Sequence, residues 1–222
     1  MSRKNHTGSG STRRASAKRA PSHATRSPAE AALPGHRHQV RIIGGEWRGR
    51  KLHFPQSPAI RPTPDRVRET VFNWLQSHVA GLRCLDLFAG SGALGFEALS
   101  RGAREAVFVE TDPEAIRHVG QMLQTLKCDR GEAVCMDAFA YLAQPAEPFG
   151  LVFLDPPFAD RVLPRLCSLL ETRGWLHPGA YVYLEDAASA GDPELPPGWT
   201  LLRSKRAGEV GYHLARRQQN NE

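Results

Sequence analysis

The clearest structural signal in this 222-residue chain is the stretch Leu85-Asp86-Leu87-Phe88-Ala89-Gly90-Ser91-Gly92-Ala93-Leu94-Gly95. Its glycines have the spacing G-x-G-x-x-G, between an apolar run and a helical segment. Glycines so spaced allow a tight turn and a close approach of the backbone to a nucleotide-like ligand. The stretch therefore predicts a strand, a ligand-binding loop and a helix of an α/β sheet. The alternative is a glycine turn that only allows tight strand–helix packing.

The chain beyond residue 81 alternates between predicted strands and predicted helices. The strands are the apolar runs Cys84–Phe88, Ala106–Val109, Ala133–Met136, Leu151–Leu154 and Tyr181–Leu184, and the helices lie near 92–101, 113–126, 138–144 and 161–173. Such alternation predicts a parallel sheet with helices on both faces. Thr200–Arg206 and Val210–Arg216 flank a short turn and predict an antiparallel pair. We therefore predict an α/β, Rossmann-like domain over 81–217, whose seven-stranded, mostly parallel sheet ends in an antiparallel hairpin. This arrangement fits a methyltransferase better than a dehydrogenase.

Residues 39–80 predict a smaller element ahead of this domain. Val40–Ile43 is a short β-run, Gly44-Gly45 a turn signal and Glu46–Phe54 a second strand, which together predict a hairpin. Thr63-Pro64-Asp65 then predicts a helix start, with threonine as N-cap, proline at the first position and an acid in the first turn. The apolar stripe of this helix is Val67, Val71, Trp74, Leu75 and Val79.

Positive charge is concentrated towards the N-terminal end. The formal net charge is +6, yet residues 41–68 hold seven Lys/Arg against two acids, whereas residues 69–222 hold fourteen against twenty. This asymmetry suggests that a polyanion approaches from one side. We predict that the substrate is bound by Arg48, Arg50, Lys51, Arg61, Thr63, Arg66 and Arg68, with Arg203, Lys205 and Arg206 as a weaker second cluster. Surface charge or pairing with Asp65 and Glu69 is the alternative for the basic side chains.

Residues 1–38 are rich in Ser, Arg, Ala, Gly and Pro and are predicted to form a disordered basic tail. Such a tail could contact RNA, act as an organelle transit peptide or be dispensable. The sequence has no run of 18 apolar residues, no signal-peptide core and no metal-ligand spacing among its four cysteines. We therefore expect a cytoplasmic protein with reduced cysteines, no membrane association and no metal.

Three acids follow three successive predicted strands and bear on the identity of the ligand. Asp86 would repel a pyrophosphate on the glycine loop but would attract the ammonium group of S-adenosylmethionine. Glu110 is placed to accept from both ribose hydroxyls, and Asp137 from the adenine amino group. The sequence thus favours S-adenosylmethionine as cofactor, although each acid alone could be a solvated strand end. The predicted cofactor-binding residues are Asp86, Phe88, Ala89, Gly90, Ser91, Gly92, Glu110, Thr111, Asp137 and Ala138.

The fourth strand runs directly into Asp155-Pro156-Pro157-Phe158, which we predict to be the catalytic residues. Two prolines fix two φ angles and hold the turn rigid. The Asp155 carboxylate and the Pro156 carbonyl then offer two acceptors to an exocyclic amino group and orient its nitrogen for methyl transfer. Phe158 can stack on the base, which must be unpaired or flipped out. The alternative is a proline-stiffened turn with a capping aspartate.

At these motifs the chain resembles a known family. Asp155-Pro156-Pro157-Phe158 and the loop Asp86–Gly92 resemble those of class I methyltransferases acting on amino groups of adenine, guanine or cytosine. The strings Arg41–Leu52, Arg61–Leu75 and Gly208–Tyr212 are similar to the bacterial 16S ribosomal RNA guanine-N2 methyltransferases that modify guanine 966. The resemblance covers about residues 40–215. It implies a guanine N2 in ribosomal RNA as the target, a partly assembled 30S subunit as partner, and RNA contact by residues 39–80; we expect a monomer.

Three other functions are compatible with parts of the sequence. A DNA adenine-N6 methyltransferase would share the tetrapeptide, but no added target-recognition domain is evident. An NAD-dependent oxidoreductase would share the G-x-G-x-x-G loop. A non-catalytic RNA-binding module would explain the basic region but has no need of a rigid amino clamp.

Overall fold

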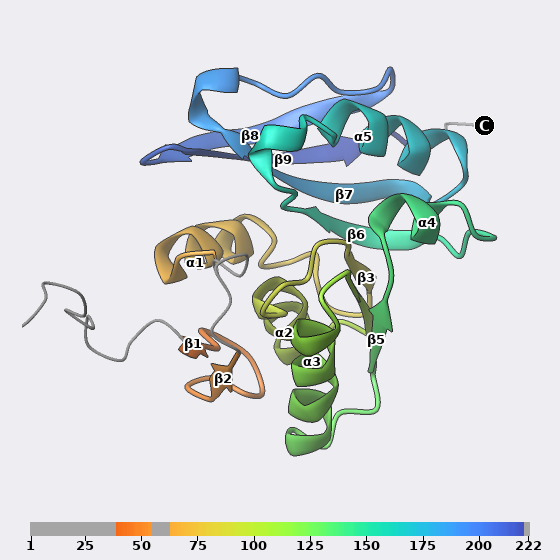
Figure 1. Ribbon diagram of the computed structural model, residues 1–222. Helices are drawn as coiled ribbons and strands as arrows, with labels where there is room; N and C mark the ends of the chain where they lie inside the picture. The colour runs from red at the N-terminus through yellow and green to blue at the C-terminus, as the bar shows by residue number, and fades with distance from the viewer. Residues whose placement is uncertain (1–38, 55–62, 220–222) are drawn as a thin grey trace, which may run out of the picture. The chain divides into compact units, whose positions relative to one another are not determined.

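The computed structural model describes residues 39–54 and 63–219, all of which belong to the unit His36–Glu222 (Figure 1). The tail predicted at 1–38 and the candidate Arg61 lie outside the described residues. Within the described ranges, no helix has the length and apolar character needed to cross a bilayer.

A seven-stranded sheet forms the centre of the unit, in the order β5-β4-β3-β6-β7-β9-β8 (Figure 1). Its strands are β3 (Arg83–Asp86), β4 (Glu105–Glu110), β5 (Gly131–Cys135), β6 (Phe149–Leu154), β7 (Leu176–Ala187), β8 (Trp199–Ala207) and β9 (Val210–Arg217). Neighbours from β5 to β7 pair in parallel, and β9 pairs antiparallel with both β7 and β8. The predicted fold class is confirmed, with β9 as the inverted strand.

Helices cover the two faces of this sheet, because successive side chains of each strand point to opposite faces. One apolar core joins the sheet to α1 (Asp65–Trp74), α2 (Ala93–Ser100) and α3 (Pro113–Thr125). The other joins it to α4 (Ala138–Leu142) and α5 (Leu163–Thr172). Two short 3-10 turns, η1 (Phe158–Asp160) and η2 (Ala188–Ala190), follow β6 and β7. All four helices predicted between the strands are present.

The N-terminal hairpin is shorter than predicted. It pairs only β1 (Gln39–Arg41) with β2 (Lys51–His53), and residues 46–49, predicted as the start of the second strand, form a turn. The reason is that backbone N–H groups of this segment donate hydrogen bonds to acceptors on α2. Ile43 N and Gly44 N each donate to the Glu97 carboxylate at 2.8 Å, and Glu46 N donates to the Ser100 carbonyl at 2.7 Å.

Helix α1 has the predicted apolar face but a different start. Val67, Val71 and Leu75 are buried, as the stripe indicated. The helix begins at Asp65, and the residue before it, Pro64, makes no side-chain cap hydrogen bond. Thr63 is therefore not the predicted N-cap; its side chain turns towards the carboxyl groups of Asp155 and Glu185.

Arg68, on the buried face of α1, has no exposed surface, so the prediction that it contacts substrate is wrong. Its guanidinium lies 2.7 Å from the Asp65 carboxylate and 3.6 Å from that of Glu97, and it donates to the carbonyls of Thr63 and Arg41. A buried arginine is tolerated only when it is paired in this way. The alternative interpretation, pairing with Asp65, holds for this residue.

Candidate active site

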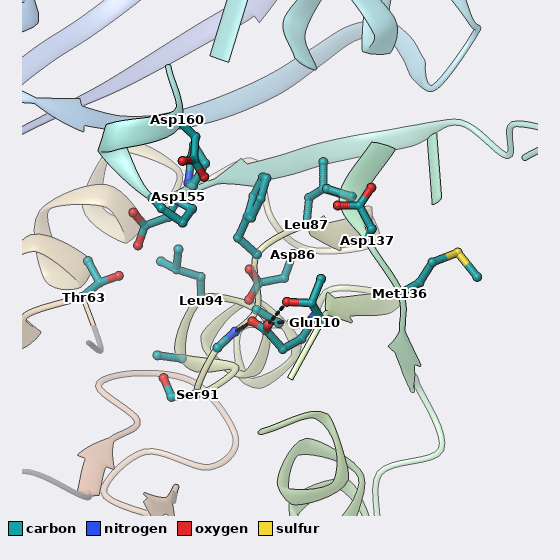
Figure 2. Close-up of a pocket in the computed structure, with 18 of the residues that line it drawn as sticks. Thr63, Asp86, Leu87, Ser91, Leu94, Glu110, Met136, Asp137, Asp155 and Asp160 are labelled. Carbon is teal, nitrogen blue, oxygen red and sulfur yellow. Dashed lines mark hydrogen bonds between the residues drawn. The ribbon is translucent and has the colours of Figure 1, made fainter. Parts of the chain in front are cut away.

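A pocket of about 620 Å³ opens at the carboxyl ends of β3, β4, β5 and β6 (Figure 2). It lies at the sheet edge where ligands bind in open α/β folds. Its lining comprises Thr63, Asp86–Ser91, Ala93, Leu94, Glu110, Thr111, Met136–Ala138, Asp155–Phe158 and Asp160. The predicted cofactor-binding residues, except Gly92, and all four predicted catalytic residues thus line one pocket.

The pocket is strongly acidic. Asp86, Glu110, Asp137, Asp155 and Asp160 contribute carboxyl groups, and the described lining includes no Lys, Arg or His. Such a lining attracts a cationic ligand and repels a pyrophosphate, because the Coulomb energy has the opposite sign in the two cases. The electrostatics of the pocket therefore favour a sulfonium- and ammonium-bearing nucleoside over a nicotinamide dinucleotide.

The glycine loop is held by two of these acids from opposite ends. Gly90 N donates to Glu110 at 2.9 Å, and Gly95 N donates to Asp86 at 2.9 Å. Gly90 and Gly92 have φ of 49° and 74°, in the region that favours glycine. Gly92 lies behind the lining, where a Cβ would come within 2.8 Å of the Phe96 ring. It shapes the loop without lining the pocket.

Asp86 is buried at the end of β3, with 3% of its surface exposed. Burial raises the pKa of its carboxyl to about 7; the Gly95 hydrogen bond opposes this rise, and the charges of Asp155 and Glu110 add to it. A cation bound in the pocket would favour the ionised form. Asp86 is therefore suited to meet the ammonium group of a ligand.

Glu110 and Asp137 each accept structural hydrogen bonds from the backbone that follows their strands. Oε1 of Glu110 accepts from Thr111 N at 2.7 Å and from Asp112 N at 3.0 Å. Oδ1 of Asp137 caps α4 by accepting from Phe139 N at 2.9 Å and Ala140 N at 3.0 Å. Among the described residues all hydrogen bonds of Asp137 use Oδ1, which leaves Oδ2 for a donor on a ligand.

Asp155-Pro156-Pro157-Phe158 joins the end of β6 to η1 and closes one side of the pocket (Figure 2). Burial raises the pKa of Asp155 to about 6, and a hydrogen bond with the Thr63 side chain opposes this rise. Figure 2 shows the Thr63 and Asp155 side chains next to each other. At neutral pH the carboxyl is therefore mostly ionised and accepts hydrogen bonds.

Of the predicted substrate residues that the structure describes, Thr63 lines this pocket and the basic ones do not. Arg48, Arg50, Lys51 and Arg66 are exposed, and none of them lines it. Leu87, Ala93, Leu94, Met136 and Asp160 line it but were not among the predicted site residues. Their only sequence signal was their position next to predicted site residues or within the glycine stretch. The buried acid Glu185, on β7, was also missed.

The inverted strand β9 and the acidic pocket at the carboxyl ends of the strands agree with the fold of methyltransferases, the class to which this chain belongs. Within that class it belongs to the family described as Conserved hypothetical protein 95, whose model matches residues 40–216.

Two bacterial relatives and one solved structure are similar over most of the chain. The "Ribosomal RNA small subunit methyltransferase D" of Escherichia coli (strain K12) is 48% identical over 184 residues, which are 83% of this chain and 93% of that protein. The protein of the same name from Haemophilus influenzae is 45% identical over 82% of this chain and 95% of its own length. The solved structure of the "Putative methyltransferase yhhF from Escherichia coli" has a TM-score of 0.77 and 47% identity, covering 81% of this chain and 98% of that one.

Proposed function

We propose that this protein transfers a methyl group to the exocyclic N2 of a guanine in 16S ribosomal RNA of the small ribosomal subunit. The observation that carries the proposal is that Asp155-Pro156-Pro157-Phe158 and the acid-held glycine loop line the same pocket. The relatives named as small-subunit ribosomal RNA methyltransferases support RNA as the polymer. The resemblance of the N-terminal strings favours the site of guanine 966.

The pocket residues at the glycine loop and at the ends of β3, β4 and β5 fit S-adenosylmethionine. When bound, this cofactor supplies an electrophilic methyl group on a sulfonium. Asp86 would meet its ammonium group, because a buried carboxyl gains most from an adjacent cation. Glu110, at the end of β4, would accept from the ribose hydroxyls. Asp137 would accept from the adenine amino group through Oδ2, with Phe88 and Ala138 beside it in the lining.

The segment Asp155-Pro156-Pro157-Phe158 would hold the target base. The ionised Asp155 carboxylate and the Pro156 carbonyl accept the two amino hydrogens of an exocyclic nitrogen, which directs its lone pair into the pocket. Phe158, half-buried in the lining, can stack on the base. The base must leave its helix to reach this depth, so an unpaired or flipped nucleotide is required.

The experiment that tests the function follows labelled methyl groups. Purified protein is incubated with S-adenosylmethionine and, in parallel, with unmethylated small subunits, naked 16S RNA or DNA; nucleosides are then identified by mass spectrometry. The expected product is N2-methylguanosine in small-subunit RNA, with methylation of DNA at background. Product only as N6-methyladenine in DNA would contradict the proposal. The same comparison of RNA substrates tests our proposal that a partly assembled subunit is the preferred partner.

We further propose that residues 39–80 contact the RNA backbone. Arg48, Arg50 and Lys51 are exposed in and before β2. Replacing all three by glutamate is expected to weaken RNA binding by about 10- to 100-fold at low salt and to reduce the slope of log K against log[salt] by about 2 to 3, since each phosphate contact contributes slightly less than one. The measurement is RNA binding by fluorescence anisotropy over a salt series.

A matched control tests the location of this surface. Arg104, Arg117 and Arg173 are exposed basic residues in the methyltransferase domain, and their replacement by glutamate gives the same change in net charge. We expect this control to change the salt slope by less than one. Equal losses for both triple variants would show that RNA responds to overall charge and not to residues 39–80.

A further inference from the structure

A second buried carboxyl group, that of Glu185, lies on the strand next to Asp155. Leu154 of β6 pairs with Leu184 of β7 in parallel register, so the next residues along, Asp155 and Glu185, are neighbours. Adjacent strands are about 4.8 Å apart and paired residues point to the same face. Glu185 is only 3% exposed and does not line the pocket.

Two hydroxyl groups connect this acid to its surroundings. The Tyr183 hydroxyl, fully buried on the same strand, donates to Oε1 of Glu185 at 2.5 Å. The Thr63 side chain lies within reach of both Asp155 and Glu185 just before the start of α1, and Figure 2 shows it next to Asp155. Thr63 lines the pocket, so one of these hydrogen-bonding side chains faces the space where the substrate would bind.

The number of hydrogens on these side chains fixes which group donates and which accepts in each hydrogen bond. A threonine hydroxyl has one hydrogen and can donate to only one of two carboxyls. If Thr63 donates to an ionised Asp155, it can only accept from Glu185, which must then carry a proton. Tyr183 donates to the other oxygen of Glu185, so that every member has a partner.

The electrostatics favour a proton on Glu185 over a proton on Asp155. Burial raises the pKa of Glu185 to about 8, the charge of Asp155 adds to the rise, and the Tyr183 hydrogen bond opposes it. A Thr63 hydroxyl that donated to Glu185 would also oppose the rise, whereas one that accepts from the protonated acid does not. The pKa of Asp155 rises only to about 6. Between these values a single proton shared by the two groups resides mainly on Glu185.

We propose that protonated Glu185 is a positioning residue, which holds the Thr63 hydroxyl towards Asp155 and so keeps that carboxylate ionised and oriented for the amino group. The inference rests on the proposed function, since it presumes that Asp155 accepts from the substrate. Glu185 and Thr63 would thus both act on amino-group methylation through the position and charge of Asp155.

The groups that face Glu185 determine the effect of pH. They are Asp155 on β6, Tyr183 on its own strand, Thr63 before α1, and Tyr212, which pairs with Glu185 from β9. None of these is a cation. When Glu185 loses its proton, the Thr63 hydroxyl is drawn to a second anion, and Asp155 loses its donor. With a pKa of about 8, activity should therefore fall about tenfold between pH 7 and pH 9.

The test compares two substitutions of Glu185 over this pH range. Glu185→Gln keeps an acceptor for Tyr183 and a donor for Thr63 but cannot ionise; Glu185→Leu keeps the bulk and removes both hydrogen bonds. We expect Glu185→Leu to lower kcat at pH 7 by about 30-fold or more, and Glu185→Gln to recover at least a third of wild-type kcat without the alkaline fall. Measurements use saturating small subunits and S-adenosylmethionine.

A second pair of variants addresses Thr63. Thr63→Val removes the bridging hydroxyl and should raise the pH at which the acid limb of kcat reaches half-maximum, whereas Thr63→Ser should restore it. An alkaline fall in Glu185→Gln equal to that of the wild type, or an acid limb unmoved by Thr63→Val, would overturn the inference. Binding of S-adenosylhomocysteine by calorimetry shows which variants are folded, and the Glu185→Gln profile tests the proposal even if Glu185→Leu does not fold.

Failure of this inference can be told apart from failure of the proposed function. An inactive Asp155→Ala variant together with unchanged pH profiles in the Glu185 and Thr63 variants would reject only the role of Glu185. An active Asp155→Ala variant would reject the amino clamp itself.

Discussion

Asp155→Ala is expected to lower methyl transfer to small-subunit RNA by about 10²–10³-fold, the range found when one preorganised hydrogen-bonding group of an active site is removed. Alanine removes the acceptor that faces the amino group and leaves the Pro156 carbonyl alone to orient it. The cofactor side should be nearly unaffected, because Asp86 and Glu110 end other strands and Asp137 caps α4. Single-turnover transfer and calorimetry with S-adenosylhomocysteine measure the two effects separately.

Asp155→Asn and the pH dependence of kcat distinguish two roles of Asp155, which are to orient the amino group as an acceptor and to carry a negative charge. Asp155→Asn keeps one acceptor oxygen and should lose less activity than Asp155→Ala. In the wild type, kcat should rise with pH through about 6, since burial raises the pKa of Asp155 to that value and only the ionised form has both oxygens free to accept. This acid limb should be absent in Asp155→Asn. Undiminished transfer by Asp155→Ala would remove the tetrapeptide from the mechanism.

Glu97→Ala is expected to lower the free energy of unfolding by about 3–5 kcal/mol, the cost of breaking a buried ion pair from one side. The Glu97 carboxylate is fully buried and accepts from Ile43 N, Gly44 N and the Arg101 side chain. It also lies 3.6 Å from the buried Arg68 guanidinium. Its loss leaves two backbone donors and part of a buried charge unpaired. Urea denaturation followed by circular dichroism measures the change.

The control for this prediction is Glu114→Ala. Glu114 forms an exposed pair with Arg117 at 3.9 Å on α3, so its removal should cost less than about 1 kcal/mol. Replacing Arg68 and Glu97 together by leucine should cost less than the sum of the single changes, because no buried charge is then left alone. A loss below about 1 kcal/mol in Glu97→Ala would mean that this carboxylate does not hold residues 43–44 to α2.

The sequence alone determined the class of fold and the pocket that contains the ligand site. Alternating apolar runs and helical segments predicted the strands and helices, because period and spacing are properties of neighbouring residues. Parallel strands all end at one edge of the sheet, so residues that follow them converge there whatever lies between. For this reason the order of strands along the chain was enough to assign Asp86, Glu110, Asp137 and Asp155 to one pocket.

Which polar groups pair across the chain follows from the folded arrangement of the strands and helices. Arg68 is an internal partner of Glu97. Residues 46–49 do not extend the second strand, because the backbone N–H groups of Ile43, Gly44 and Glu46 donate to α2. Thr63 faces Asp155 and Glu185 instead of capping its helix. Each of these pairings joins groups far apart in the chain, and depends on strand register and on how a helix sits on the sheet. Local periodicity carries no information about either, so these contacts had to be found in the folded molecule.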